Sequence, residues 1–104
     1  MRMIRSRMVL AAALALASPV SFAQSPGAAT YKAKCQMCHG ATGAADTPTA
    51  KMLKVKPVSD PDIKKLTEEE MIAAVKNGKG KMKPVVGLTD AQIKDTVAFY
   101  RDLK

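Results

Sequence analysis

Both cysteines of this chain and its only histidine lie within five residues, at Cys35, Cys38 and His39. On a helical turn, residues three and four apart share one face, so these side chains can reach one flat ligand together. Two thiols at this spacing can each add across one vinyl group of the same porphyrin, and the imidazole then points at its iron. C-x-x-C-H is the attachment motif of c-type haem. The sequence therefore predicts one covalent haem c, held by Cys35 and Cys38 and ligated through its iron by His39.

Three different uses of the two cysteines explain the motif less well. A structural zinc site needs four ligands, and this chain offers two cysteines and one histidine unless a carboxylate joins them. A thioredoxin-like pair lies near a βαβ pattern, but no alternating β-branched run indicates strands here. A disulfide between Cys35 and Cys38 would close a very small loop, which restricts the unfolded chain little.

The second axial ligand must be a methionine or a lysine, because the chain has no second histidine. Met37 lies inside the attachment turn and cannot reach the opposite face of the ring. Met71 has another explanation, since it can pack against Leu66 at a helix start. Met82 lies in the polar loop at residues 78–84, where nothing else accounts for an isolated thioether.

Met82 is therefore the predicted sixth ligand of a low-spin His/Met iron. Gly78 and Gly80 let the backbone approach a flat ligand closely, and Pro84 fixes the direction of the loop. Met52 also remains a candidate for this position. The lysines of the loop could take it as well, namely Lys79, Lys81 and Lys83.

The N-terminus has the three parts of a secretory signal peptide. Residues 1–7 carry three arginines and no acid, residues 8–17 are an unbroken apolar run, and Ser21 and Ala23 are the small residues of a cleavage site. The apolar run is shorter than the roughly 20 residues that span a bilayer. We expect residues 1–23 to be removed on export to the periplasm, with no stable membrane insertion afterwards. Cleavage would lower the formal net charge from +8 to about +5.

Residues 24–104 then form one small domain with two tyrosines, one phenylalanine and no tryptophan. Domains of this size are marginally stable and often need a cross-link or a bound group to stabilise the fold. A buried porphyrin would supply the missing apolar volume, so we expect the haem-free chain to fold poorly.

Three helices are predicted from capping and periodicity, and a short fourth at residues 49–54. The first runs from Pro26 to about Cys38, with Ser25 as the N-cap and Gly40 as the stop. The second follows a capping box between Thr67 and Glu70 and ends near residue 77.

The third follows a second capping box, between Thr89 and Gln92, and reaches nearly to residue 104. It buries a face made by Ile93, Val97 and Tyr100, which Ala98 and Phe99 would widen.

At residues 27–40, in the Met82 loop and at residues 88–100, the chain resembles class I c-type cytochromes of the small, single-haem bacterial kind. The resemblance implies an all-α fold of three to four helices wrapped around one covalently attached haem. It also implies that the first and last helices cross, with Gly27 and Tyr31 against Phe99 or Tyr100.

In that family a proline carbonyl accepts the proton of the proximal imidazole, and Pro48 is the candidate. One departure is that Lys83, rather than a proline, directly follows Met82.

The expected function is a periplasmic one-electron carrier and not an enzyme, since six-coordinate iron has no open site for substrate. The resemblance implies redox partners in a respiratory chain, such as a quinol-oxidising complex or dehydrogenase and a terminal oxidase or reductase. A lysine-rich surface would dock acidic partners, although such a run can also be a solvated loop. Nucleic acid is not an expected partner of a secreted protein. The lysines of this surface are Lys76, Lys79, Lys81 and Lys83.

Two further functions remain open. A five-coordinate haem sensor or peroxidase-like enzyme would require that Met82 does not bind the iron. The chain could also serve as the haem subunit of a larger oxidoreductase.

Overall fold

Side-chain caps set the start of four helices in the computed structural model, which describes residues 25–103. Thr47, Asp60, Thr67 and Thr89 each accept a hydrogen bond from a backbone N–H two or three residues further on. The helices are α1 (Ala28–Lys34), α2 (Gln36–His39), α3 (Pro48–Leu53), α4 (Pro61–Lys64), α5 (Glu68–Asn77) and α6 (Asp90–Asp102). The predicted signal peptide, residues 1–23, lies outside the described residues.

The described part of the chain is all-α, which confirms the predicted fold class. Its only β-type pairing is an isolated bridge between Lys79 and Met82. Across residues 25–103, no helix has the length and apolar character needed to cross a membrane.

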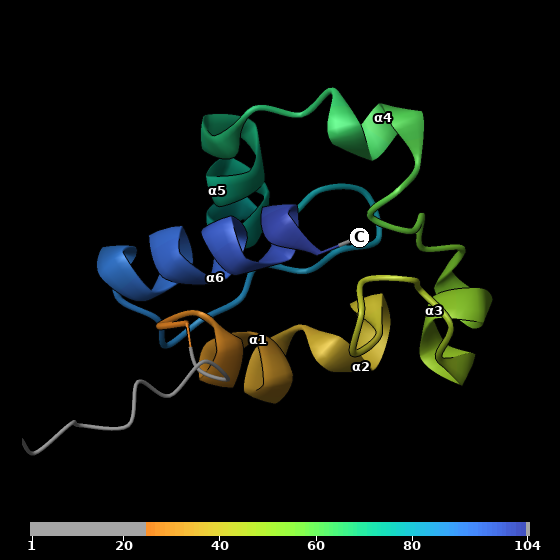
Figure 1. Cartoon of the computed structure of the whole chain (residues 1–104), viewed down its shortest axis with the longest axis horizontal. Helices are drawn as coiled ribbons and strands as arrows, with labels where there is room; N and C mark the ends of the chain where they lie inside the picture. Colours follow the sequence, from red (N-terminus) through yellow and green to blue (C-terminus); the bar gives the residue numbers. More distant parts are fainter. Residues whose placement is uncertain (1–24, 104) are drawn as a thin grey trace, which may run out of the picture.

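Helix α6 is the centre of the fold, with α1 packed on one side of it and α5 on the other (Figure 1). Gly27 makes the crossing of α1 and α6 close. A Cβ atom at Gly27 would lie 2.8 Å from the Cα atom of Thr96 and would overlap the carbonyl of Asp95. Gly27 therefore lies directly against the α6 backbone, at the predicted crossing of the first and last helices.

Tyr31 makes the predicted aromatic contact with the last helix. Its ring centroid lies 5.2 Å from that of Phe99 and 6.1 Å from that of Tyr100. The side chain is 2 % exposed, so the crossing buries one of the few large residues of the chain. Aromatic pairs at these distances add to the stabilisation that burial alone gives.

The apolar core joins α5 to α6 through Met71, Val75, Ile93 and Val97. The predicted face of the last helix is confirmed, with Ile93 and Val97 each 3 % exposed and Tyr100 packed against the cluster. Ala98 is exposed and does not widen this face, because its position turns it towards solvent. The core of residues 25–103 is small, as the composition indicates.

The first helix differs from its prediction at both ends. Gly27, not Ser25, is the N-cap, and it makes no side-chain cap bond. The close crossing at Gly27 explains why the helix begins there. The predicted run to Cys38 is broken at Cys35, whose backbone (φ −118°, ψ −32°) separates α1 from α2. Gly40 ends α2 with φ 82°, as predicted.

The middle of the chain contains more helix than the sequence predicts. The short helix α4 has no counterpart among the predicted helices, and Pro61 occupies its first turn, where a proline is well tolerated. Pro48 has the same role in α3.

The two predicted capping boxes have different outcomes. The box of Thr89 and Gln92 forms in full, with both bonds present at 3.1 and 2.9 Å. At Thr67 only one half of the box forms, the 3.1 Å bond from the Glu70 N–H.

Candidate cofactor site

Two hydrogen bonds to backbone carbonyls fix the C-x-x-C-H segment to its surroundings. The Tyr31 hydroxyl donates a 2.6 Å hydrogen bond to the carbonyl of Gly40, which directly follows the motif. The Thr47 hydroxyl donates a 2.6 Å bond to the carbonyl of Met37, inside the motif. Cys35 and Cys38 remain free thiols and are not joined in a disulfide. The break at Cys35 and these two bonds position the motif on the molecule.

Two cavities adjoin this segment. The deeper one has a volume of about 350 Å³ and extends to Tyr31, Met71, Val97 and Tyr100. The wider one has a volume of about 740 Å³ and also borders Cys38. The residues that line both cavities are Cys35, His39, Lys79 and Met82. Both predicted axial ligands and one predicted attachment thiol therefore meet where the cavities join.

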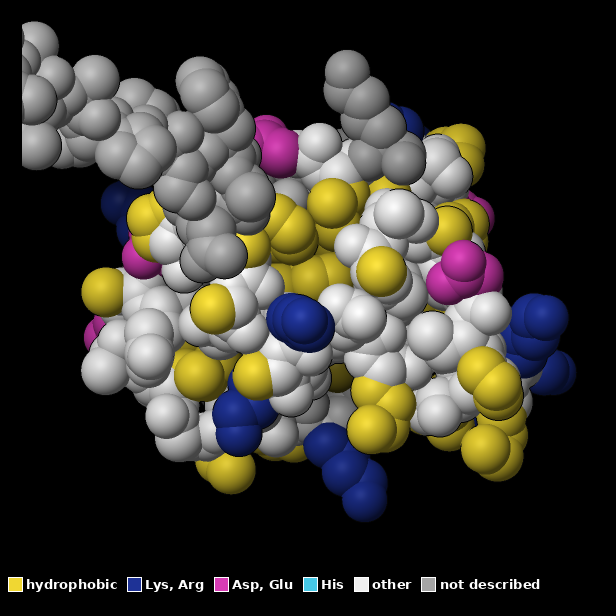
Figure 2. All heavy atoms as spheres, turned by 60° about the horizontal axis from the view of Figure 1, so that its bottom comes forward, with side chains coloured by type: hydrophobic (Ala, Val, Ile, Leu, Met, Phe, Trp, Pro, Cys, Tyr) yellow, Lys and Arg dark blue, Asp and Glu magenta, His cyan; other side chains and the backbone are white. Residues whose placement is uncertain are grey.

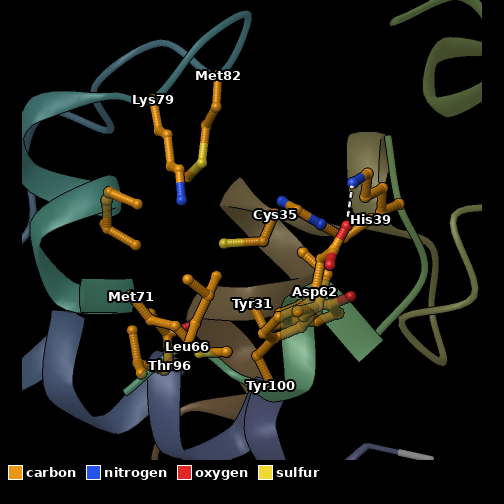
Figure 3. A pocket seen from close by; sticks show the side chains of 15 residues that line it. Tyr31, Cys35, His39, Asp62, Leu66, Met71, Lys79, Met82, Thr96 and Tyr100 are labelled. Carbon is orange, nitrogen blue, oxygen red and sulfur yellow. Dashed lines mark hydrogen bonds and ion pairs between the residues drawn. The ribbon is translucent and has the colours of Figure 1, made fainter. Parts of the chain in front are cut away.

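The close view of the deeper cavity shows the side chains of Met82 and Lys79 pointing into it from the loop after α5 (Figure 3). Cys35 points into it from the junction of α1 and α2. At one side of the cavity, Lys56 and Asp62 form an ion pair of 2.7 Å between exposed side chains. Lys56 lowers the pKa of the Asp62 carboxyl, because its ammonium group donates a hydrogen bond to the carboxylate and carries the opposite charge.

His39 is half-buried beside Tyr100, and burial affects the charge of its ring. Burial lowers the pKa of its imidazole, which favours the neutral ring that metals prefer. The ring packs edge-on against Tyr100 at a centroid distance of 5.2 Å. Its Nδ1 is buried without a hydrogen-bond partner within the described residues. The prediction that the Pro48 carbonyl accepts a proton from His39 is therefore wrong here, because Pro48 begins α3 instead.

A tight reverse turn positions Met82. Its N–H and carbonyl each bond to Lys79 at 2.9 Å, and the Val85 N–H donates to the Val75 carbonyl at 2.8 Å. Gly78 opens the turn with φ 79°, and a Cβ atom there would lie 2.7 Å from the Met82 carbonyl oxygen. Met82 is half-buried and packs against the core. The loop therefore directs its thioether inward.

The other candidates for the sixth iron ligand differ in their exposure and in whether they line a cavity. Met37 and Met52 are 73 % and 72 % exposed, and neither lines a cavity. Met71 is 8 % exposed and belongs to the core, although it also borders the deeper cavity. Lys79 lines both cavities, as Met82 does, whereas Lys81 and Lys83 line only the wider one. Among the loop lysines, Lys79 is therefore the alternative to Met82 as the sixth iron ligand.

Sequence reasoning missed Thr96, which lines the deeper cavity and is 2 % exposed. It lies three residues after Ile93 and four before Tyr100, on the apolar face of α6. This spacing puts Thr96 on the same helix face as Ile93 and Tyr100, so the sequence could have predicted that Thr96 is buried there.

The donor set fits a haem. An imidazole, a thioether and two free thiols line cavities with largely apolar walls, as a porphyrin requires.

Lysines surround the wider cavity. Lys34, Lys54, Lys79, Lys81 and Lys83 line it, and they come from three separate segments. The face that carries α1 to α3 has Lys and Arg side chains spread among apolar ones (Figure 2). Lys76 lines neither cavity and instead pairs with Asp90 at 2.8 Å, so the predicted lysine group loses one member.

Comparison with known proteins identifies the class to which this fold and motif belong. A KustC0563 c-type cytochrome superimposes with a TM-score of 0.68 at 27 % identity, covering 75 % of this chain and 96 % of the second chain. A tyrosine-to-phenylalanine mutant of Kustc0563 gives a TM-score of 0.65 at 25 % identity, covering 75 % and 98 %. No curated protein matches the chain.

Residues 22–99 match the family described as cytochrome C oxidase, cbb3-type, subunit III. The chain therefore belongs to this family, and it is a class I c-type cytochrome. Membership implies covalently bound haem c and haem-based electron transfer.

Proposed function

We propose that this protein is a periplasmic one-electron carrier with a single haem c. Cys35 and Cys38 would hold the porphyrin through thioether bonds, and His39 and Met82 would bind its iron. The haem would supply a one-electron redox couple when bound. The burial of His39 would favour its neutral ring as a ligand, and the apolar walls of the deeper cavity would contact the porphyrin.

The observation that carries this proposal is the meeting of Cys35, His39 and Met82 at the junction of two cavities. Met82 is far from the motif in sequence, and a thioether that lines the same cavities as an imidazole matches a His/Met site. Ligation of this kind favours fast electron transfer, because neither axial ligand must leave when the oxidation state changes.

The lysines around the wider cavity support docking to acidic redox partners. Opposite charges raise the encounter rate and orient the partners before contact. Lys81 and Lys83 are exposed and lie in the Met82 loop, so a partner bound to them would approach the cofactor site.

A visible spectrum of the exported protein tests the haem proposal directly. The full chain is expressed with a haem-attachment system, and its ferric and ferrous spectra are recorded. We expect haem that stays with the polypeptide after denaturation and a weak sulfur-to-iron band in the ferric form. Haem that is released on denaturation contradicts attachment, and fast, complete binding of carbon monoxide to ferrous protein favours a five-coordinate sensor or enzyme.

A second function has support from the family description. A protein of the family described as an oxidase subunit could serve as the haem subunit of a larger oxidoreductase. Purification from native membranes and from the periplasmic extract separates the two functions. Recovery with an oxidase complex favours the subunit, and recovery as a free monomer favours the carrier.

The same preparation tests export. We propose cleavage after Ala23, so the intact mass should equal that of residues 24–104 plus one haem. A mass that includes residues 1–23 would exclude it.

A further inference from the structure

Thr96 places a buried hydroxyl in the wall of the deeper cavity. The residue is 2 % exposed, and its Oγ1 has no hydrogen-bond partner within residues 25–103. It belongs to the face of α6 that otherwise presents Ile93, Val97 and Tyr100. Thr96 is thus a polar group on an otherwise mostly apolar surface.

This arrangement has a cost that valine would avoid. Burying a hydroxyl without a partner destabilises the fold, whereas valine has nearly the same shape and no polar atom. Thr96 also lies under the close crossing of α1, where its Cα atom would be 2.8 Å from a Cβ atom on Gly27. Its position is therefore tightly fixed, and the hydroxyl needs a partner nearby.

A candidate partner is the sulfur of Cys35, because Cys35 and Thr96 line the same cavity (Figure 3). Burial raises the pKa of the Cys35 thiol, and the Thr96 hydroxyl opposes this rise, which agrees with a contact between the two groups. They form no regular hydrogen bond in this structure. The hydroxyl hydrogen turns about the Cβ–Oγ1 bond and can be directed at the sulfur.

We propose that the Thr96 hydroxyl donates a hydrogen bond to the Cys35 sulfur and thereby raises the reduction potential of the attached haem. The inference rests on the proposed attachment at Cys35. Thr96 acts as a positioning residue, since it reaches the haem only through that sulfur.

The direction of the effect follows from charge. A thioether sulfur has no proton to donate, so in the mature protein the hydroxyl must be the donor. Donation draws electron density from the sulfur and from the ring to which it is bonded. An electron-poorer ring destabilises the oxidised state, which carries one more positive charge. The bond therefore favours the reduced protein.

The test compares Thr96→Val with Thr96→Ser in the haem-loaded full chain. At the midpoint potential of the wild-type protein, Thr96→Val should have at least a twofold higher ratio of oxidised to reduced protein. That ratio corresponds to about 18 mV, at 59 mV per tenfold change for one electron. Thr96→Ser keeps the hydroxyl and should stay near the wild-type ratio, although it loses a buried methyl group.

A purely packing role gives the opposite pattern. Thr96→Val would then match the wild type, and Thr96→Ser would differ because of its missing methyl group. Equal ratios in Thr96→Val and the wild type overturn the proposal, and they would indicate that the hydroxyl bonds to a helix carbonyl or an internal water.

Two checks keep the result interpretable. If Thr96→Val does not mature, Thr96→Ala is compared with Thr96→Ser, since both lack the methyl group and only serine keeps the hydroxyl. Equal ratios in that pair also overturn the proposal. Failure of the wild-type protein to carry covalent haem contradicts the proposed function instead, so the two failures are distinguishable.

Discussion

At the scale of single residues, the site depends on a few side chains that each have one defined contact. His39 packs on Tyr100, Met82 points inward, and the Tyr31 hydroxyl donates to the carbonyl that follows the motif. Each contact can be removed by one substitution. Changes at this scale should therefore have separate spectroscopic or energetic effects.

Replacing Met82 with alanine should remove the sixth ligand. We expect the sulfur-to-iron band to disappear and ferrous protein to bind carbon monoxide quickly. Met52→Ala is the matched control, because Met52 is 72 % exposed and lies outside both cavities. A band that survives in Met82→Ala and disappears in Met52→Ala would reverse the assignment. If Met82→Ala stays six-coordinate, the double change with Lys79→Ala identifies whether Lys79 takes the position.

Replacing Tyr31 with phenylalanine should leave the Gly40 carbonyl without its 2.6 Å partner. An unsatisfied buried group costs about 1–3 kcal/mol, so the free energy of unfolding should fall by that amount. Denaturant titration measures it. The Tyr100 hydroxyl makes no hydrogen bond that the structure describes within residues 25–103, so Tyr100→Phe is the control. An equal or smaller loss in Tyr31→Phe than in Tyr100→Phe would contradict the role of this bond.

The same tyrosine predicts a loss of stability in alkali. Burial, aided by the charge of Tyr100, raises the pKa of Tyr31 above its usual value of about 10. The unfolded chain therefore releases this proton at lower pH than the folded one. The contribution of Tyr31 is complete below about pH 10 and decreases as the pH rises further. In Tyr31→Phe the decrease above pH 10 should be smaller, and an unchanged slope would count against this explanation.

At the scale of elements, turns and helix crossings place the ligands. The crossing at Gly27 brings Tyr31 onto α6, and the turn at Gly78 directs Met82 inward. Both depend on a glycine, for different reasons. Gly27 has ordinary φ and lacks space for a side chain, whereas Gly78 lacks space and also has positive φ. The loop after α5 is therefore less tolerant of change than its polar composition suggests.

Two neighbouring glycines separate the effect of space from that of backbone conformation. Gly78→Ala should displace the Met82 carbonyl, and it should weaken or abolish the sulfur-to-iron band. Gly80→Ala meets no atom within 4 Å, although Gly80 has φ 57°. It should cost only about 1 kcal/mol of unfolding free energy and keep the band. Equal band loss in both variants would show that positive φ, and not the contact with Met82, governs the loop.

At the scale of the whole molecule, residues 25–103 combine large open cavities with a small core. Four buried residues form the α5–α6 cluster, and cavities of about 350 and 740 Å³ adjoin the C-x-x-C-H segment. A porphyrin bound there would add apolar contacts to those of this small cluster. The cofactor therefore belongs to the core as well as to the site.

The chain without haem should lack cooperative folding. Cys35→Ala with Cys38→Ala prevents covalent attachment, and circular dichroism on heating measures the transition. We expect a broad change without a sharp midpoint, in contrast with the haem-loaded wild type. A sharp transition in the haem-free double variant would show that the α5–α6 core and the α1 crossing suffice to fold the domain.

The lysines of the wider cavity should make partner association depend on salt. In Lys81→Glu with Lys83→Glu, we expect slower association with an acidic redox partner, and a smaller dependence of its rate on ionic strength. Lys64→Glu with Lys65→Glu is the control, because these exposed residues lie at the end of α4 and line neither cavity. An equal reduction of the rate in both variants would indicate net charge and not a docking surface.

Local patterns in the sequence determined the class of this protein. The C-x-x-C-H spacing, the caps at Thr67 and Thr89 and the apolar face of α6 each depend on residues within about one or two helical turns. Such features can be predicted because their geometry follows from helical periodicity alone. The caps at Thr47 and Asp60 are also local, but a proline follows each of them, and a proline can end a helix as well as begin one.

Only the tertiary structure decided how distant residues meet. The approach of Met82 to His39, the exposure of Met52, the pairing of Lys76 with Asp90 and the burial of the Thr96 hydroxyl all depend on contacts across the molecule. The break at Cys35 and the absence of a bond from Pro48 to His39 also depend on how α1, α2 and α3 pack within residues 25–103. A sequence pattern specifies one face of each element, whereas the choice of partner for that face is made by packing.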